Sequence, residues 1–282
     1  VFCDDFESGS RAAAAGGTTT IIPFAYQGKG QPLRDVVNRY HKRAEGKSLI
    51  DYAFHVILSD PSEKIMGQDF AALVADGYTS FKVYMTYDDM KLNDRQIIDL
   101  LVLARREGAM TMIHAENADC IGWLTEQLLE AGLTAPRYHA HARPMLVERE
   151  ATHRAIALAE LIDVPILIVH VSGREAVEQI RAAQSLGLKI YGETCPHYLL
   201  LTADNLDLDG FEGAKCICSP PPRDKANQGV IWRGLENGTF HVISSDHAPF
   251  AYAGPHGKQL HGTDAPFSKV PNGIPGLETR LP

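Results

Sequence analysis

Seven short runs of apolar and β-branched residues alternate with amphipathic segments along this chain, and this alternation restricts the fold more than any other feature. Each run has the length of a strand buried on both faces, and each intervening segment is long enough for a helix. Strands that alternate with helices in this way form parallel α/β folds. We expect strands over 18–24, 49–58, 80–85, 110–114, 165–171, 188–193 and 240–245.

Helices are expected between these strands, and the first of them carries clear end signals. The segment 4–15 begins with two aspartates and is followed by Gly16 and Gly17, which is typical of a helix with an acidic start and a glycine end. The tail 248–282 is rich in Gly and Pro and is expected to be loop. The other helices are expected over 33–44, 68–75, 94–107, 119–131, 148–161, 174–186 and 225–237.

The fold class that fits this order is the TIM-type (β/α)8 barrel, in which each of eight parallel strands is followed by a helix. Only seven strands can be assigned, and the helix over 4–15 has no strand before it. We therefore expect a single, incomplete barrel domain over residues 1–282. Its first strand would precede Val1, and its last helix would follow Leu281.

Composition limits the partners of the protein. The chain has 282 residues, of which 45% are hydrophobic, so it can bury a large core. A net charge of −8 without a basic stripe argues against nucleic acid or an anionic membrane as partner and favours a small molecule. No apolar run approaches the roughly 20 residues that span a bilayer, and no secretory signal is recognisable. A cytoplasmic location is expected.

The five cysteines are expected to be reduced thiols, because they are scattered and lack paired Cys-x-x-Cys spacing. Cys216 and Cys218 could bind a soft metal, but two cysteines on an apolar strand more often pack in the core. Neither a disulfide framework nor a structural zinc site is indicated.

Lys82 is out of place in the third apolar run, where Phe81, Val83, Tyr84 and Met85 surround it. An unpaired buried ammonium is costly, so such a lysine must reach water, pair with an acid or be chemically altered. A desolvated lysine with a lowered pKa is able to react with carbon dioxide. The resulting carbamate would be an anionic oxygen ligand.

Polar residues follow three other apolar runs at the strand ends, where such barrels carry their chemistry. His114 ends the fourth run, His170 the fifth and Asp246 the seventh. Each alone is more often a hydrogen-bonded structural residue or a turn cap. Together with Lys82 they would converge on one mouth, and imidazole with carboxylate suits zinc and similar divalent ions.

The stretches FKVYMTY, MIHAEN, IVHVSG, ETCPHYL, CSPPPR, SSDHAPF and VPNGIPGLETRL resemble the cyclic-amide hydrolases of the amidohydrolase superfamily. The resemblance runs from Asp4 to the end of the chain and is specific for the dihydropyrimidinase or D-hydantoinase branch. It implies a metal-dependent hydrolysis of the cyclic amide bond of 5,6-dihydropyrimidines and hydantoins to N-carbamoyl amino acids. It also implies two divalent ions, usually zinc, and a homotetramer.

The resemblance assigns a role to each candidate residue. Lys82 would be the N6-carboxylated lysine that bridges the two metals, and His114 and His170 would ligate one of them. Asp246 would ligate the other metal and carry the proton from a hydroxide bridging both metals to the leaving nitrogen. Tyr87 would bind the substrate and stabilise the oxyanion.

Ser219 and Asn272 match positions that hold the cyclic imide, largely through backbone groups. Without the resemblance both would be turn residues, and Tyr87 a partly exposed loop aromatic. His197 would lie near the mouth, with a supporting or structural role equally compatible.

The pattern is broken at one point, because the His-x-His pair that ends the family's first strand has no counterpart at the start of this chain. His139-Ala140-His141 has the same spacing, but we interpret it as a surface or substrate-loop feature between two helical segments. The family's accessory β-sandwich is also absent. We expect a chain truncated at both ends, in which one metal lacks two ligands and only the full-length protein is active.

Three alternatives remain open. A sister enzyme acting on dihydroorotate or allantoin would share fold and metal chemistry, although Tyr87 and the segment 271–273 favour the dihydropyrimidinase branch. A non-catalytic scaffold relative would lack the metal ligands, which are present here. A barrel with purely structural histidines would leave the buried Lys82 unexplained.

Overall fold

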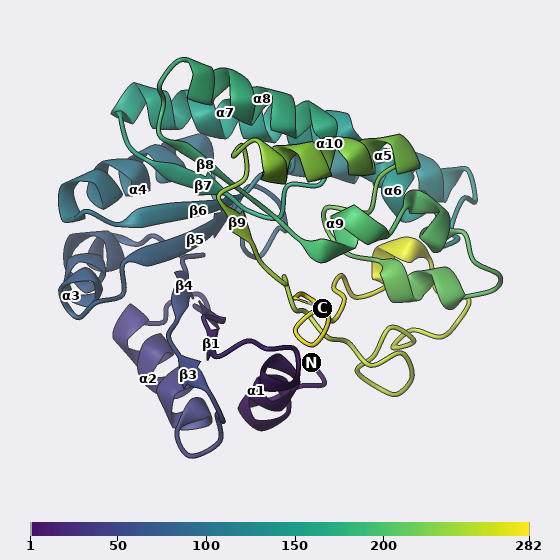
Figure 1. Cartoon of the computed structure of the whole chain (residues 1–282), viewed down its shortest axis with the longest axis horizontal. Coiled ribbons are helices and arrows are strands. Elements are labelled where there is room, and N and C mark those ends of the chain that lie inside the picture. The colour runs from purple at the N-terminus through teal and green to yellow at the C-terminus, as the bar shows by residue number, and fades with distance from the viewer. Residues whose placement is uncertain (1, 282) are drawn as a thin grey trace.

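A curled, all-parallel sheet runs through the centre of the computed structural model, which describes residues 2–281 (Figure 1). Its strands follow one another in chain order, and each pairs in parallel with the next. This arrangement confirms all seven predicted strands and the parallel fold class. The strands of this sheet are β2 (Phe24–Tyr26), β4 (His55–Ile57), β5 (Ser80–Tyr84), β6 (Met110–His114), β7 (Ile166–Ile168), β8 (Ile190–Thr194) and β9 (Val242–Ile243).

The first two predicted strands are each divided in the structure. Their N-terminal halves, β1 (Thr20–Ile21) and β3 (Asp51–Tyr52), form a separate parallel pair. Pro23 separates β1 from β2, and proline has no amide hydrogen to give to a ladder.

Helices cover the convex side of the sheet, as the barrel class requires (Figure 1). The helix α4 (Asp94–Glu107) is capped at both ends by local contacts. Asn93 accepts a bond from the backbone of Gln96, whose side chain bonds back to Asn93, and Gly108 ends the helix with φ of 73°. The helices are α1 (Phe6–Ala15), α2 (Leu33–Ala44), α3 (Phe70–Ala75), α4 (Asp94–Glu107), α5 (Ala118–Glu130), α6 (Tyr138–Ala142), α7 (Met145–Ile162), α8 (Arg174–Ser185), α9 (Pro196–Leu200) and α10 (Lys225–Glu236).

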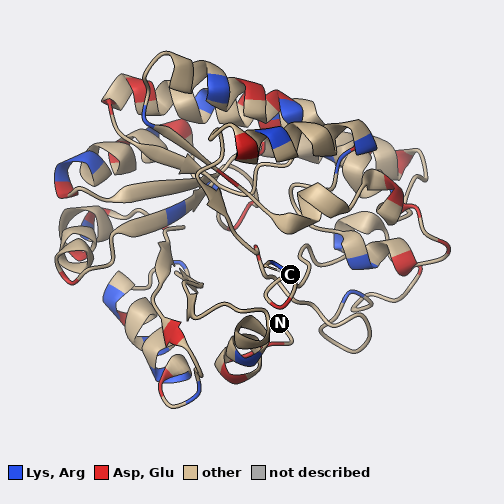
Figure 2. Ribbon diagram, viewed as in Figure 1, with Lys and Arg blue, Asp and Glu red and all other residues tan. Residues whose placement is uncertain are grey.

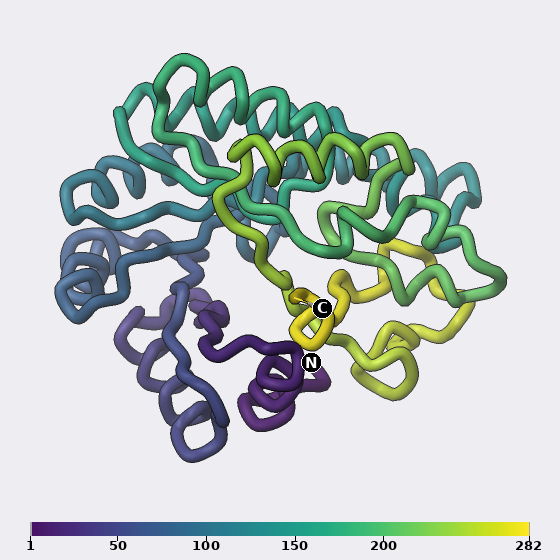
Figure 3. Tube along the Cα trace, viewed as in Figure 1, coloured from purple at the N-terminus to yellow at the C-terminus, as the bar shows by residue number. Residues whose placement is uncertain are grey.

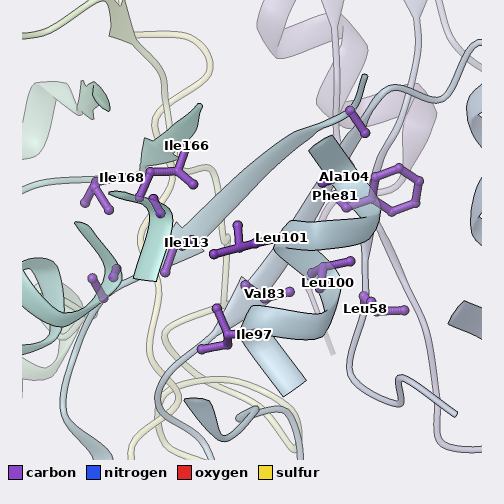
Figure 4. Packing of buried hydrophobic residues seen from close by; sticks show 14 of the residues in the cluster. Leu58, Phe81, Val83, Ile97, Leu100, Leu101, Ala104, Ile113, Ile166 and Ile168 are labelled. Carbon is purple, nitrogen blue, oxygen red and sulfur yellow. The ribbon is translucent and has the colours of Figure 1, made fainter. Parts of the chain in front are cut away.

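The main core lies between the sheet and these helices. Phe81 and Val83 of β5 and Ile113 of β6 point outward, where Figure 4 shows them packed against Leu100 and other apolar residues of α4. Each is fully buried, and truncation of such a side chain to alanine costs about 2–5 kcal/mol. The charged residues lie mostly on the outer helices and the loops rather than on the central strands (Figure 2).

The alternating residues of the same strands face the inside of the curled sheet. Strand register places Lys82 beside Met112, and Met112 beside Leu167, in one layer. The next layer toward the strand ends contains Tyr84 beside His114. The period of two in a strand therefore separates the chemistry-bearing residues on the inner face from the apolar residues of the outer core.

The long irregular stretches are more structured than the sequence indicates. The short helices α6 and α9 were not predicted, a π-helical turn η1 (Ile65–Asp69) precedes α3, and 3-10 turns occur at η2 (Ala203–Leu206), η3 (Glu212–Cys216) and η4 (Phe267–Lys269). Leu206, Phe211 and Ile217 form a second apolar cluster with Phe267 and Val270 of the tail. The tail predicted as loop is thus packed against the irregular stretch, as its path in Figure 3 shows.

The two ends of the described chain lie side by side (Figure 3). The amide of Cys3 donates to the carbonyl of Pro249, and His247 Nε2 lies 2.7 Å from Asp4 Oδ2. Within residues 2–281, no helix is long and apolar enough to cross a membrane. The assignment of residues 1–282 to one domain stays a prediction.

Candidate active site

Of the predicted metal ligands, His114 ends β6, His170 and Asp246 follow the ends of β7 and β9, and Lys82 lies in the middle of β5 on the inner face of the sheet. The imidazole rings of His114 and His170 have centroids 4.4 Å apart at an interplanar angle of 70°. Both side chains are buried, and burial lowers the pKa of each below the ordinary histidine value. The two rings are therefore neutral near pH 7, which is the form that can ligate a metal.

The orientation of His114 is set by Glu116, which lies two residues further along. Nε2 of His114 is 2.7 Å from Oε2 of Glu116, and the same oxygen accepts a bond of 2.9 Å from Nη1 of Arg143. Burial acts to raise the pKa of Glu116, but Arg143 and His114 together hold it at about 2. The ionised carboxylate therefore accepts a hydrogen bond from Nε2–H of the neutral His114 ring, and Nδ1 of that ring is left with its lone pair.

Lys82 is 2% exposed, and its Nζ lies 4.8 Å from the centroid of the Phe24 ring and 4.9 Å from that of Tyr84. Burial lowers its pKa to about 8, while the negative charges of Asp246 and Glu193 oppose this shift. The charge of Lys82 in turn acts on His114 and His170. The four predicted ligands thus belong to one electrostatic cluster, although their direct coordination stays a prediction.

Backbone strain is concentrated at the same place. Tyr87, His170 and Asp246 have φ of 67°, 40° and 41°. Positive φ is uncommon for residues other than glycine and persists where the surrounding structure demands it, often at functional sites. Asp163, at the end of α7, also has positive φ and occupies a helix C-cap.

Tyr87 lies across His114 with ring centroids 5.5 Å apart, and Arg143 stands 5.8 Å from the Tyr87 ring. Burial raises the pKa of Tyr87 to about 12, so its phenol is neutral and able to donate a hydrogen bond. Without the family resemblance, Tyr87 would be a partly exposed loop aromatic, and the residue as a whole is partly exposed. Its hydroxyl group, however, is in a buried environment.

Several buried polar atoms of this region have no partner within residues 2–281. They include Nδ1 of His170, Nε2 of His197, Oγ of Ser219 and Oδ1 of Asn272. Buried polar groups are normally hydrogen-bonded, so a group of unpaired ones indicates a place that a ligand or ion fills. All four of these residues were named as site candidates from the sequence.

No group of three or more His, Cys, Asp and Glu side chains in the described part of the chain is arranged to hold an ion. The adjacent neutral rings of His114 and His170, with Nδ1 of His170 unpaired, nevertheless suit one. A carboxylated Lys82 would add an anionic oxygen donor to these two imidazoles.

The His-x-His pair lies where it was not expected. His139 is buried in α6 rather than in a surface loop, and its Nε2 is 2.8 Å from the carbonyl oxygen of Cys218. His141 is exposed. The interpretation as a surface feature is therefore wrong for His139, whose side chain holds the segment that carries Ser219.

Sequence reasoning missed Glu116, Arg143 and Lys258. Glu116 lies beside His114 in the motif MIHAEN and could have been found as a carboxylate next to a proposed ligand. Arg143 and Lys258 lie in stretches read as loop, where a charged residue normally faces water. Only the packing shows that both are buried.

The comparisons agree with the resemblance seen in the motifs. No family model matches the chain. It is 46% identical to a curated D-hydantoinase of Streptomyces coelicolor over 99% of its length and 59% of the relative's. It is 45% identical to that of Geobacillus stearothermophilus, over 58% of the relative's length. The chain thus spans less than two thirds of these relatives.

Solved structures give the same result. A dihydropyrimidinase from Brevibacillus agri superposes with a TM-score of 0.95 at 42% identity, covering 99% of this chain and 60% of that one. An L-hydantoinase from Arthrobacter aurescens superposes with a TM-score of 0.82 at 26% identity, covering 98% and 60%. With a shared fold and 45–46% identity over nearly all of its residues, the chain is similar to D-hydantoinases and dihydropyrimidinases over about 60% of their length.

Proposed function

We propose that this chain is the catalytic barrel of a hydrolase that opens 5,6-dihydropyrimidines and hydantoins to N-carbamoyl amino acids. The observation that carries the proposal is the group of unpaired buried polar atoms beside the two neutral imidazoles. A cyclic imide presents one N–H between two carbonyl groups. Asn272 Oδ1 can accept from the N–H, and Ser219 Oγ can donate to a carbonyl.

The proposed cofactor is a pair of divalent ions, with zinc the expected metal. His114 and His170 would hold one ion, Asp246 the other, and a carboxylated Lys82 both. When bound, such ions supply an activated water and polarise a carbonyl group. The lowered pKa of Lys82, about 8, supports its carboxylation, because the neutral amine is the form that reacts with carbon dioxide.

The remaining chemistry belongs to the side chains. Tyr87, neutral near pH 7, donates to the carbonyl oxygen as negative charge develops there. Asp246, partly exposed at the end of the last strand, accepts the proton of the attacking water and gives it to the leaving nitrogen. Arg143 is paired with Glu116, so its charge is already compensated and does not favour a substrate carboxylate such as that of dihydroorotate.

The test is ring opening of dihydrouracil, hydantoin, dihydroorotate and allantoin by the protein at its natural full length, with His170→Ala as the control for the site. We expect turnover of the first two, lost in the control. Turnover confined to dihydroorotate or allantoin would assign a sister activity. Absence of both turnover and bound metal would favour the non-catalytic scaffold. A homotetramer and a cytoplasmic location stay predictions from sequence.

A further inference from the structure

Lys258 is a buried lysine that the proposed chemistry does not use. It lies in the tail after β9 and is 3% exposed. Its Nζ donates to two backbone carbonyl oxygens, those of Ile217 and Pro271, each at 2.7 Å. The centroid of the Phe250 ring lies 5.8 Å from the same atom, and no carboxylate within residues 2–281 pairs with it. The ammonium therefore loses its hydration without gaining an ionic partner, so its burial needs an explanation.

The two carbonyl groups belong to the segments that carry the imide-binding candidates. Ile217 stands two residues before Ser219, and Pro271 directly precedes Asn272. The amide of Gly273 also donates to the Ile217 carbonyl, at 3.0 Å. The ammonium group of Lys258 therefore lies at the point where these two segments meet.

The first segment is also held from its other side. His139 Nε2 is 2.8 Å from the Cys218 carbonyl oxygen, and the Tyr198 hydroxyl donates to the Pro220 carbonyl at 2.9 Å. Both side chains are buried, and within residues 2–281 neither forms a hydrogen bond to the segment 271–273. Lys258 differs from them because its two bonds join the first segment to the second.

The second segment has little room to adjust. Gly273 has φ of 144°, and a Cβ atom there would come within 2.5 Å of Ala248, close to Asp246 in the chain. The amide of Ala248 donates to the Ile274 carbonyl at 3.0 Å. Segment 271–274 thus packs on the loop that carries Asp246, the proposed proton acceptor. Because Lys258 bonds to both Pro271 and Ile217, it links segment 271–274 to the segment that carries Ser219.

The backbone that carries Lys258 is itself fixed. Its amide donates to the Ala251 carbonyl at 2.7 Å, and a Cβ on Gly257 would come within 2.3 Å of the same oxygen. Burial lowers the pKa of Lys258 to about 8, with the Cys218 and Cys216 thiols opposing the shift. Lys258 is therefore still mostly protonated near pH 7 in spite of its burial, and its two bonds to carbonyl oxygens hold the ammonium group in place.

We propose that Lys258 is a positioning residue, which sets the separation of Ser219 and Asn272 and so the fit of both to a cyclic imide. This inference rests on the proposed function. The unpaired Ser219 Oγ and Asn272 Oδ1 are the atoms whose spacing must match the ring. A shift of about 1 Å in such groups can cost about 100-fold in rate. Within residues 2–281 the ammonium group of Lys258 meets the carbonyl oxygens of Ile217 and Pro271 and the ring of Phe250, none of which belongs to a proposed metal ligand.

The test compares Lys258→Met, which removes the donors, with Lys258→Arg, which keeps the charge. Lys269→Met is the matched control, because Lys269 is an exposed lysine of the same tail. We expect Lys258→Met to raise KM for dihydrouracil roughly 10- to 100-fold with a smaller fall in kcat and unchanged metal content. Lys258→Arg should recover part of the loss, and the control should match the wild type.

Hydrogen exchange gives a readout that does not depend on activity. In Lys258→Met, amides over 217–219 and 271–273 should exchange faster together, while those over 80–87 stay unchanged. Faster exchange confined to 250–262, or an unchanged KM, would overturn the proposal. If Lys258→Met does not fold, Lys258→Arg decides: wild-type KM and wild-type exchange in a variant with displaced donors would overturn it.

Calorimetric titration with hydantoin separates this proposal from the proposed function. It is carried out in an Asp246→Asn background, in which the proposed proton acceptor is removed, after the metal content of this background with and without Lys258→Met has been shown to equal that of the wild type. Weaker hydantoin binding in Lys258→Met supports the positioning role even if the wild type opens no ring. Equal binding with and without Lys258, or no binding at all, would overturn it.

Discussion

The side chain of Glu116 fixes that of His114, through a contact of 2.7 Å between Oε2 and Nε2. The same carboxylate oxygen also accepts a hydrogen bond from Arg143, so one buried carboxylate is bonded to both an imidazole and a guanidinium group. This arrangement explains how two charged side chains are tolerated behind the candidate site. It also determines which nitrogen of His114 is left for a metal.

Glu116→Gln should weaken both folding and metal binding. Loss of the charge leaves Arg143 buried without compensation, which costs about 3–5 kcal/mol, and weakens the orientation of His114, which costs about 10- to 100-fold in metal affinity. Urea unfolding and zinc titration measure the two effects. Glu7→Gln, at an exposed pair with Arg11, should cost less than about 1 kcal/mol. A Glu116→Gln protein as stable as the wild type would contradict the account.

Lys82 should carry the added mass of one carbon dioxide in native mass spectrometry of the metal-bound protein, and lose it in acid. Lys82→Arg should abolish both the adduct and most of the bound metal, because a guanidinium keeps its charge and cannot form the carbamate. Metal content should also fall when the protein is reconstituted without bicarbonate. Full metal content in Lys82→Arg would show that the lysine is not a ligand.

Tyr87→Phe should lower kcat by about 100- to 1000-fold, with a smaller change in KM, because the hydroxyl acts mainly where charge develops on the substrate oxygen. Since the pKa of Tyr87 is about 12, the donor is present throughout the neutral range. Tyr78→Phe is the control, because it also removes a tyrosine hydroxyl that makes a polar contact, here of 2.7 Å to His41 Nε2 of α2, but none of the proposed site residues takes part in that contact. Steady-state kinetics on dihydrouracil would reject this role for Tyr87 if the two variants behaved alike.

The free energy of unfolding should fall as the pH drops below about 6.5, in part through His139. Burial lowers the pKa of His139 to about 3, so the unfolded chain binds its proton between the two values while the folded protein does not. Each such group contributes a slope of at most about 1.4 kcal/mol per pH unit in that window. Urea unfolding from pH 7 to 4.5 measures it.

His139→Gln should show a shallower pH slope than the wild type, because glutamine can still donate to the Cys218 carbonyl but does not titrate. The exposed neighbour His141 offers the control, and His141→Gln should keep the wild-type slope. If both variants followed the wild type, the acid sensitivity would have to come from other buried groups.

Much of the fold could be predicted because its signals are local. The strands around Lys82 and His114 are short apolar runs between helices, and the helix predicted over 94–107 has the bounds of α4. The short helices α6 and α9 were missed because their stability comes from contacts with distant segments. Tyr198 of α9, for instance, is buried and bonds to Pro220.

The candidate site was predictable to the extent that its members follow strands. His114, His170 and Asp246 were named from that position, and the two histidines lie together as expected. Glu116, Arg143 and Lys258 could not be found in this way, because their roles depend on which distant group they meet inside the fold. A charged residue in a loop-like stretch gives no sign that it is buried.

The sequence by itself determined the parallel α/β class, the order of the strands and the residues at their ends, because periodicity and capping act between near neighbours. The tertiary structure alone decided that His139 and Lys258 lie inside and hold the segment before Pro220, because burial depends on contacts between parts of the chain that are far apart. These contacts place Ser219 and Asn272 relative to each other, and spacing of that kind is not encoded in any local pattern.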